Sequence, residues 1–262
     1  MEIPLGMILN RIDAFILIFV RMTGLFVMAP IFGRRNIPAY LKVGFSFMLA
    51  LILANTLKAP RIDAYNDIYT YLLLVTREFI VGITIGYVSY LAFTGIYMAG
   101  QIIDMQVGFG MVNVLDPVSN IQVPVTSNFY FIITMLVFLA ANGHHMLIKA
   151  LFSSYQFIPL GGAEFGSNLY TDIMASFGNI FIIGIKISAP IIGAILITDI
   201  ALGVISRSVP QLNVFVVGMP LKIAMGIIIM LITIPMLIAL VNILMNGMNN
   251  EVFNFIKDMG PK

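Results

Sequence analysis

The residue types that most often perform catalysis are few in this chain, and their spacing does not fit a known kind of site. His144 and His145 are the only histidines. Adjacent residues of a helix point about 100° apart, so this pair is poorly placed to bind one metal ion. The His-Glu-x-x-His spacing of zinc proteases is absent as well. We expect these histidines to cap a helix or to contact a partner.

Serine, cysteine and glycine motifs indicate no active site either. Ser153-Ser154 and Ser206–Ser208 lack the Gly-x-Ser-x-Gly elbow that exposes a nucleophilic serine. The Gly-Phe-Gly sequence at Gly108–Gly110 lacks the Lys-Ser/Thr pair that a phosphate-binding P-loop requires. The chain has no cysteine, which excludes a disulfide scaffold, a zinc-thiolate site and a cysteine nucleophile. We therefore predict a protein that is not an enzyme and that has no cofactor and no metal site.

The composition indicates a membrane protein. Of the 262 residues, 60% are hydrophobic and only 10% are charged, whereas about one quarter of the residues in soluble domains are charged. The net charge of +2 and the lack of a basic cluster argue against a nucleic-acid partner. The N-terminal sequence lacks the basic region of a cleaved signal peptide, so we expect the first apolar stretch to be retained. We predict one integral membrane domain over residues 1–262.

The apolar stretches have lengths that fit a membrane poorly. They cover about Ala14–Phe32, Leu41–Leu57, Ile68–Ala99, Phe129–Ala141, Ile173–Ile205 and Val214–Leu244. A single membrane span needs about 20 residues, and three of these stretches are too long for one span and short for two. Prolines and charges also interrupt them, so we expect broken or kinked helices that are covered by protein. The alternative is an ordinary polytopic protein, and the positions of Lys and Arg do not settle the topology.

Charged residues inside apolar stretches are candidates for function, because a lone charge in lipid is costly. They are Arg21, Arg77, Glu78, Lys186, Asp199 and Lys222. We favour pairing within the chain or between subunits over a proton or ion relay. Arg77 and Glu78 are adjacent, so they face different directions on a helix and each needs its own partner.

The segment Gly100–Val125 is the most unusual part of the chain. Glycines and prolines interrupt it too often for one regular helix, and it is too apolar for a solvated loop. We predict a loop over about residues 100–126, and a loop of this length usually has a function. Met105 and Met111 flank Val107 and Phe109, and methionine adapts its shape to changing neighbours. From the residues alone, a deformable hydrophobic seal and a static packing loop are equally good interpretations.

Several sequence blocks resemble one family of membrane proteins. The blocks are Arg21–Gly24, Ala29–Pro38, Gly100–Pro117, Asn142–Leu151, Ser154–Gly161 and Ser188–Lys222. In this order and spacing, across nearly the whole chain, they resemble the FliR/SctT family of the type III export apparatus. The overall pattern resembles the flagellar members more than the injectisome members.

This resemblance implies an all-α integral membrane fold, in which about six long, partly broken hydrophobic segments form helical hairpins in a pseudo-helical export-gate assembly. It implies FliP-like and FliQ-like subunits and FlhB-like and FlhA-like export components as partners, and unfolded flagellar proteins as export substrates. It places the protein in the bacterial inner (cytoplasmic) membrane, at the flagellar basal body. The subunit would form part of a pore and would catalyse no reaction itself.

The resemblance also implies roles for particular residues. The central loop would act as a plug that closes the pore against ions. The residues of this plug are Met105, Gln106, Val107, Gly108, Phe109, Gly110 and Met111, and the turn that ends the loop is Asp116-Pro117. Intersubunit or hairpin-tip contacts are expected at Arg207, Pro210, Gln211 and Asn213. The charges expected to be buried or between subunits are Arg77, Glu78, Lys186, Asp199, Arg207 and Lys222.

Two other functions remain as alternatives. A secondary transporter with broken helices would require repeat symmetry between the two halves and a polar cluster, and neither is clear in the sequence. An intramembrane enzyme would require His144, His145 and the aspartates to converge, and their spacing gives no reason to expect this.

Overall fold

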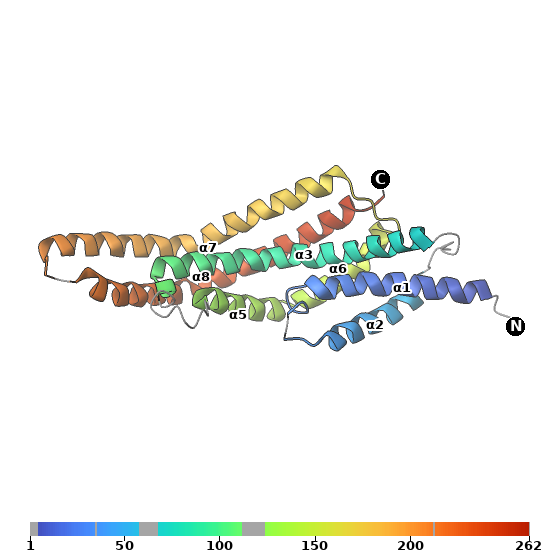
Figure 1. Cartoon of the computed structure of the whole chain (residues 1–262), viewed down its shortest axis with the longest axis horizontal. Helices are drawn as coiled ribbons and strands as arrows, with labels where there is room; N and C mark the ends of the chain where they lie inside the picture. The colour runs from blue at the N-terminus through green and yellow to red at the C-terminus, as the bar shows by residue number, and fades with distance from the viewer. Residues whose placement is uncertain (1–4, 35, 58–67, 112–123, 212, 262) are drawn as a thin grey trace. The chain divides into compact units, whose positions relative to one another are not determined.

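A computed structural model describes residues 5–34, 36–57, 68–111, 124–211 and 213–261 (Figure 1). The helices are α1 (Leu5–Met28), α2 (Ala39–Thr56), α3 (Ile68–Val107), the short 3-10 helix η2 (Phe109–Met111), α5 (Val125–Ala140), α6 (Gly143–Phe157), α7 (Ser167–Ser208) and α8 (Val214–Asp258). Within these residues there is no strand. The predicted all-α fold class is confirmed.

Three of the helices are much longer than a membrane span. α3 has 40 residues, α7 has 42 and α8 has 45, so each is about 60 Å long or more. Pro190 lies inside α7, and Pro220 and Pro235 lie inside α8. The expected interruptions therefore do not end these helices. A proline removes one backbone hydrogen bond, and the bonds on either side keep a long membrane helix continuous.

The length and composition of the helices fit a membrane protein. Among the described residues, α2, α3, α7 and α8 are each long and apolar enough to cross a membrane. α5 and α6 meet at a short break and add a fifth span if the pair is counted as one. This number is slightly lower than the about six segments that the sequence suggests, and the chain is an all-α integral membrane protein.

Two helical regions differ from the sequence prediction. α3 continues to Val107, so the expected loop begins at Gly108 instead of near Gly100. Gly100 permits a close approach, because a Cβ atom at this position would be 2.3 Å from the Cα atom of Ser127 in α5. α6 was not expected as an apolar stretch, since it carries polar residues that include the two histidines.

The described helices form two compact units. Unit 1 contains Met1–Leu91, Asn142–Ser176 and Asn246–Lys262, and unit 2 contains Ala92–Ala141 and Phe177–Met245. α3, α7 and α8 contribute residues to both units.

In unit 1, α1 lies directly on α3. A Cβ atom on Gly82 would be 2.1 Å from the carbonyl oxygen of Arg21, and one on Gly24 would be 2.6 Å from the carbonyl oxygen of Phe79. Gly82 and Gly86 are four residues apart, the spacing at which small residues let membrane helices approach closely. The crossing of α1 and α3 therefore depends on glycine.

Aromatic rings join α2 to α1 in the same unit. Phe47 of α2 contacts Phe15 and Phe19 of α1 edge-on, with ring centroids 5.4 and 6.2 Å apart. Edge-to-face contacts of this kind add to the stabilisation that burial provides. Figure 1 shows α1 and α2 side by side.

In unit 2, the last part of α3 packs on α5 and α7. Phe93 of α3 contacts Phe131 and Phe138 of α5, with ring centroids 5.8 and 5.4 Å apart. Gly95 of α3 faces Ile183 of α7, and a Cβ atom on Gly95 would be 3.0 Å from its Cγ2 atom. These contacts position the last part of α3, which ends with Met105, Gln106 and Val107, the first three residues of the predicted plug.

Candidate functional site

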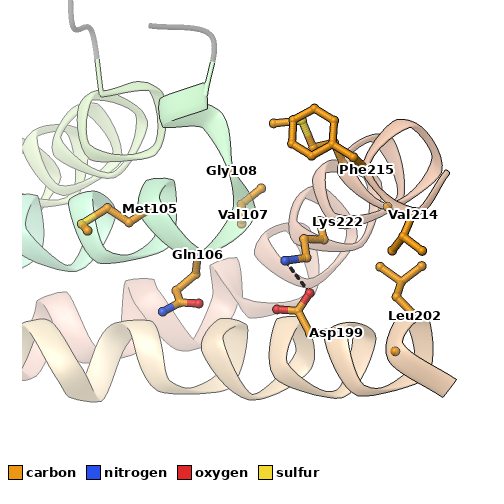
Figure 2. Close-up of a pocket in the computed structure, with 12 residues that line it drawn as sticks. Met105, Gln106, Val107, Gly108, Asp199, Leu202, Val214, Phe215 and Lys222 are labelled. Carbon is orange, nitrogen blue, oxygen red and sulfur yellow. Dashed lines mark ion pairs between the residues drawn. The ribbon is translucent and has the colours of Figure 1, made fainter. Parts of the chain in front are cut away.

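The first residues of the predicted plug border a pocket in unit 2 (Figure 2). The pocket has a volume of about 470 Å³ and is lined by residues 105–108, by part of α7 between Asp199 and Gly203, and by part of α8 between Val214 and Lys222. The end of α3 therefore lies beside the end of α7 and the beginning of α8.

Three consecutive residues at the end of α3 have different environments. Met105 is 80% exposed, Gln106 is exposed and Val107 is fully buried. Val107 packs on Gly226 of α8, where a Cβ atom would be 2.6 Å from the Cγ2 atom of the valine. The predicted plug thus begins with the exposed side chains of Met105 and Gln106, and the buried side chain of Val107 follows them.

Gly108 ends α3 with a backbone conformation that favours glycine. Its φ angle is +95°, and this left-handed region is strained for residues with a Cβ atom. By contrast, a Cβ atom on Gly110 would meet nothing within 4 Å. Phe109, Gly110 and Met111 form η2. The predicted turn residues Asp116 and Pro117 lie outside the described residues.

Asp199 of α7 and Lys222 of α8 form an ion pair at the pocket (Figure 2). Their side chains are 38% and 29% exposed, respectively. The sequence indicates that each charge needs a partner, but it does not pair the two. In the folded chain each is the partner of the other, because the facing ends of α7 and α8 bring them together.

The chain that follows the central segment is also held against α3. The Asp104 carboxylate accepts a hydrogen bond from the backbone N–H of Thr126 over 2.9 Å, and the Ser127 hydroxyl donates one to the carbonyl oxygen of Tyr97 over 3.0 Å. Thr126 lies in the first turn of α5, where backbone N–H groups have no partner within the helix. Asp104 therefore caps α5 from α3.

Glu78 is paired with Arg21 of α1 in the interior of unit 1. Both side chains are fully buried. The Nε and Nη2 groups of Arg21 donate to the two carboxylate oxygens of Glu78 over 2.5 and 3.0 Å, a bidentate geometry that gives strong hydrogen bonds. The backbone N–H of Gly161 donates to Glu78 Oε1 over 2.7 Å. Both charges were candidates from the sequence, which does not pair them.

Residues at the end of α6 complete this Arg21–Glu78 cluster. Arg21 Nη1 donates to the Ser154 hydroxyl oxygen over 3.0 Å, and both Nη atoms donate to the Ile158 carbonyl oxygen over 3.2 Å. The guanidinium carbon lies 4.0 Å from the centre of the Tyr155 ring. Together with the bonds to Glu78, these contacts use the donors of the guanidinium group. The cluster joins α1, α3 and the end of α6.

The other predicted charges have different surroundings. Arg77 is half-buried, whereas Lys186 and Arg207 are exposed. None of the three forms an ion pair with another residue that the structure describes. Their role between subunits stays a prediction.

The turn between α7 and α8 contains the other residues that were expected to make contacts. Pro210 and Gln211 are exposed. Asn213 accepts hydrogen bonds from the backbone N–H groups of Phe215 and Val216 over 3.1 and 3.4 Å. This is the geometry of an N-cap residue, so Asn213 has a role within the chain at the start of α8.

The two histidines lie at the beginning of α6. The centroids of their rings are 4.1 Å apart, and His145 Nδ1 is 3.4 Å from the side-chain oxygen of Asn142. Across the described ranges, no three His, Cys, Asp or Glu side chains are grouped so that they could hold a metal ion. The arrangement is a local contact at a helix start.

Comparison with known proteins shows the family of this chain. Residues 12–248 match the family described as bacterial export proteins, family 1. The chain is 38% identical over 240 residues to the flagellar biosynthetic protein FliR of Bacillus subtilis (strain 168), with 89% of this chain and 91% of that protein covered. It is 30% identical over 239 residues to FliR of Escherichia coli (strain K12), with 91% and 89% covered.

A protein of another export system is also similar. The Yop proteins translocation protein T of Yersinia pestis is 29% identical over 224 residues, with 82% of this chain and 84% of that protein covered. The family match includes residues of both units and every described residue of the predicted plug. The chain belongs to the FliR/SctT family of bacterial export proteins.

Proposed function

We propose that this chain is a core subunit of the flagellar type III export gate and forms part of the pore through which unfolded flagellar proteins leave the cell interior. Its family makes it a membrane-embedded component of type III export and not an enzyme. The FliR proteins of Bacillus subtilis and Escherichia coli, which are 38% and 30% identical to it, support the flagellar system over the injectisome. Because the chain belongs to this family, an export component is favoured over the alternative of a secondary transporter.

The observation that carries this proposal is the uncovered apolar surface of α8. Its exposed large apolar side chains run from Phe215 to Ile243, over about 42 Å of helix, which is longer than the roughly 30 Å of a hydrocarbon core. Only 17% of its most apolar 18-residue stretch is buried within the chain. A helix that is apolar over so great a length requires cover from other protein subunits as well as from lipid.

We assign this cover to FliP-like and FliQ-like subunits, with FlhB-like and FlhA-like export components adjoining the assembly. Residues 1–262 would act as one export-gate domain within a pseudo-helical arrangement of helical hairpins. The assembly would lie in the bacterial inner (cytoplasmic) membrane, at the flagellar basal body.

Within this pore we assign Met105–Met111 as the plug, ended by the Asp116-Pro117 turn. Exposed Met105 supplies a flexible apolar side chain that can adapt to different neighbours. Gly108 supplies a change of chain direction directly after α3. Apolar side chains of this kind close a pore by excluding water, and a passing polypeptide would displace them.

Co-purification from the native membrane tests the proposed assembly. We expect the tagged chain, extracted in mild detergent, to carry FliP-like and FliQ-like subunits in fixed ratios, measured by mass spectrometry. FlhB-like and FlhA-like components would be present in smaller amounts. A chain that purifies alone or as a homo-oligomer would contradict the export-gate assignment.

Gly108→Val is expected to raise the ion conductance of the assembled complex. A β-branched residue at φ +95° carries a strain of about 1–3 kcal/mol, which would displace the plug. Conductance is measured on the complex in planar bilayers. Gly193→Val in α7 is the matched control, because a Cβ atom on Gly193 meets nothing within 4 Å. Equal conductance of the two variants in intact complexes would contradict the plug role.

A further inference from the structure

Val107 differs from its neighbours in the predicted plug because its side chain is fully buried. It is the last residue of α3 and directly precedes Gly108. Its two methyl groups lie 2.6 and 2.9 Å from the position that a Cβ atom on Gly226 would take. Valine has a restricted χ1 angle and cannot easily rotate away. Val107 thus occupies the space that a side chain at position 226 would fill.

One face of α8 supports this contact. Gly218, Lys222 and Gly226 are spaced four residues apart and therefore lie on the same face of the helix. A Cβ atom on Gly218 would be 3.1 Å from the Cδ1 atom of Leu202 in α7, and Lys222 is paired with Asp199 of α7. α7 is thus held on the same face of α8 that receives Val107. The ion pair and Val107 line the same pocket (Figure 2).

We infer that Val107 is the fixed anchor of the plug, and that the Asp199–Lys222 pair is a positioning element that keeps Gly226 in place to receive it. The pair connects α7 to α8 at a defined register, one helical turn from Gly226. The consequence is that the plug moves from Gly108 onward while Val107 stays packed on α8. This consequence rests on the proposed plug function.

Disulfide cross-linking tests the anchor directly, because the chain has no cysteine of its own. The Val107 Cβ atom lies 3.4 Å from the Cβ position of Gly226, close to the separation of about 3.5–4.5 Å in disulfides. We expect Val107→Cys with Gly226→Cys to cross-link under mild oxidation in the native membrane complex, measured as loss of thiol labelling that reductant restores. The control is Val107→Cys with Ile228→Cys, since Ile228 is 50% exposed and lies on the opposite side of α8.

The ion pair is tested in the same cysteine background. Asp199→Asn is expected to lower the cross-linking yield several-fold, and so is Lys222→Met. The charge-reversed pair, Asp199→Lys with Lys222→Asp, is expected to restore the yield, which a loss of general stability would not predict. A cross-linking yield of Val107→Cys with Gly226→Cys at the level of the Ile228 control would overturn the anchor. A cross-linking yield that is the same in the charge variants would overturn the positioning role.

Conductance of the assembled complex separates the anchor from the plug. Gly226→Ala is expected to displace the end of α3 and to raise conductance, and Val107→Ala in the same chain is expected to lower it again by vacating the space. When Gly226→Ala raises conductance, a double variant that conducts equally would overturn the anchor role. Cross-linking as expected, with unchanged conductance in every variant, would support the anchor and remove the plug function. A leak without cross-linking would support the plug and overturn the anchor.

Discussion

Glu78→Leu is expected to lower the free energy of unfolding by about 3–5 kcal/mol, the cost of removing one partner from a buried ion pair. Arg21 would remain fully buried and would lose two of its hydrogen-bond acceptors. The N–H of Gly161 would lose its acceptor as well. The measurement is thermal and denaturant unfolding of the purified protein in detergent, followed by circular dichroism.

The double variant Arg21→Met with Glu78→Leu is the control that identifies the cause. It removes both charges and keeps apolar volume, so it is expected to be more stable than Glu78→Leu. It will remain less stable than the natural chain, because the cluster also involves Ser154, Tyr155 and the Ile158 carbonyl. If Glu78→Leu proved as stable as the double variant, an uncompensated charge would not be the source of the loss.

Gly82→Leu is expected to destabilise the protein by more than the about 1–3 kcal/mol that is typical of an overpacked core. The new Cβ atom would lie 2.1 Å from the backbone oxygen of Arg21 and 3.1 Å from the Cα atom of Gly24. Backbone atoms of a helix cannot rotate away as a side chain can, so α1 must move away from α3. This movement would also disturb the pairing of Arg21 with Glu78, and the same unfolding measurement would detect the loss.

Gly44→Leu is the matched control for this substitution. Gly44 also lies inside a helix of unit 1, but a Cβ atom there would meet nothing within 4 Å. Its replacement is expected to leave stability nearly unchanged or to raise it slightly, since leucine favours helix more than glycine does. Similar unfolding temperatures for the two variants would refute the close crossing of α1 and α3.

The sequence alone identified the class of protein and its family. A chain with so few charges and so many apolar residues cannot be an ordinary soluble domain, and helices satisfy their backbone groups in a membrane without help from other segments. The ordered blocks from Arg21 to Lys222 indicated the FliR/SctT family, and the comparisons confirm it. Both conclusions depend on composition and local order, which need no knowledge of how the helices pack.

The central segment shows where sequence interpretation reached its limit. Glycines and prolines suggested one continuous loop over about residues 100–126, but α3 continues to Val107. Gly100 serves close helix packing, and Gly108 has the left-handed conformation. The family resemblance also implied the same role for Met105 and Val107. The tertiary structure separates them, because α8 carries Gly226 opposite one residue and leaves the other exposed.

The same limit applies to the charges. Composition shows that Arg21, Glu78, Asp199 and Lys222 need partners, because an isolated charge in an apolar environment is costly. It does not show which partner each one finds. Helices that are apolar on most sides have no amphipathic pattern to mark the buried face. Arg21 meets Glu78 across 57 residues of chain only because α1 and α3 cross at glycines. The sequence thus determined that these groups must be compensated, and the packing of the helices decided how.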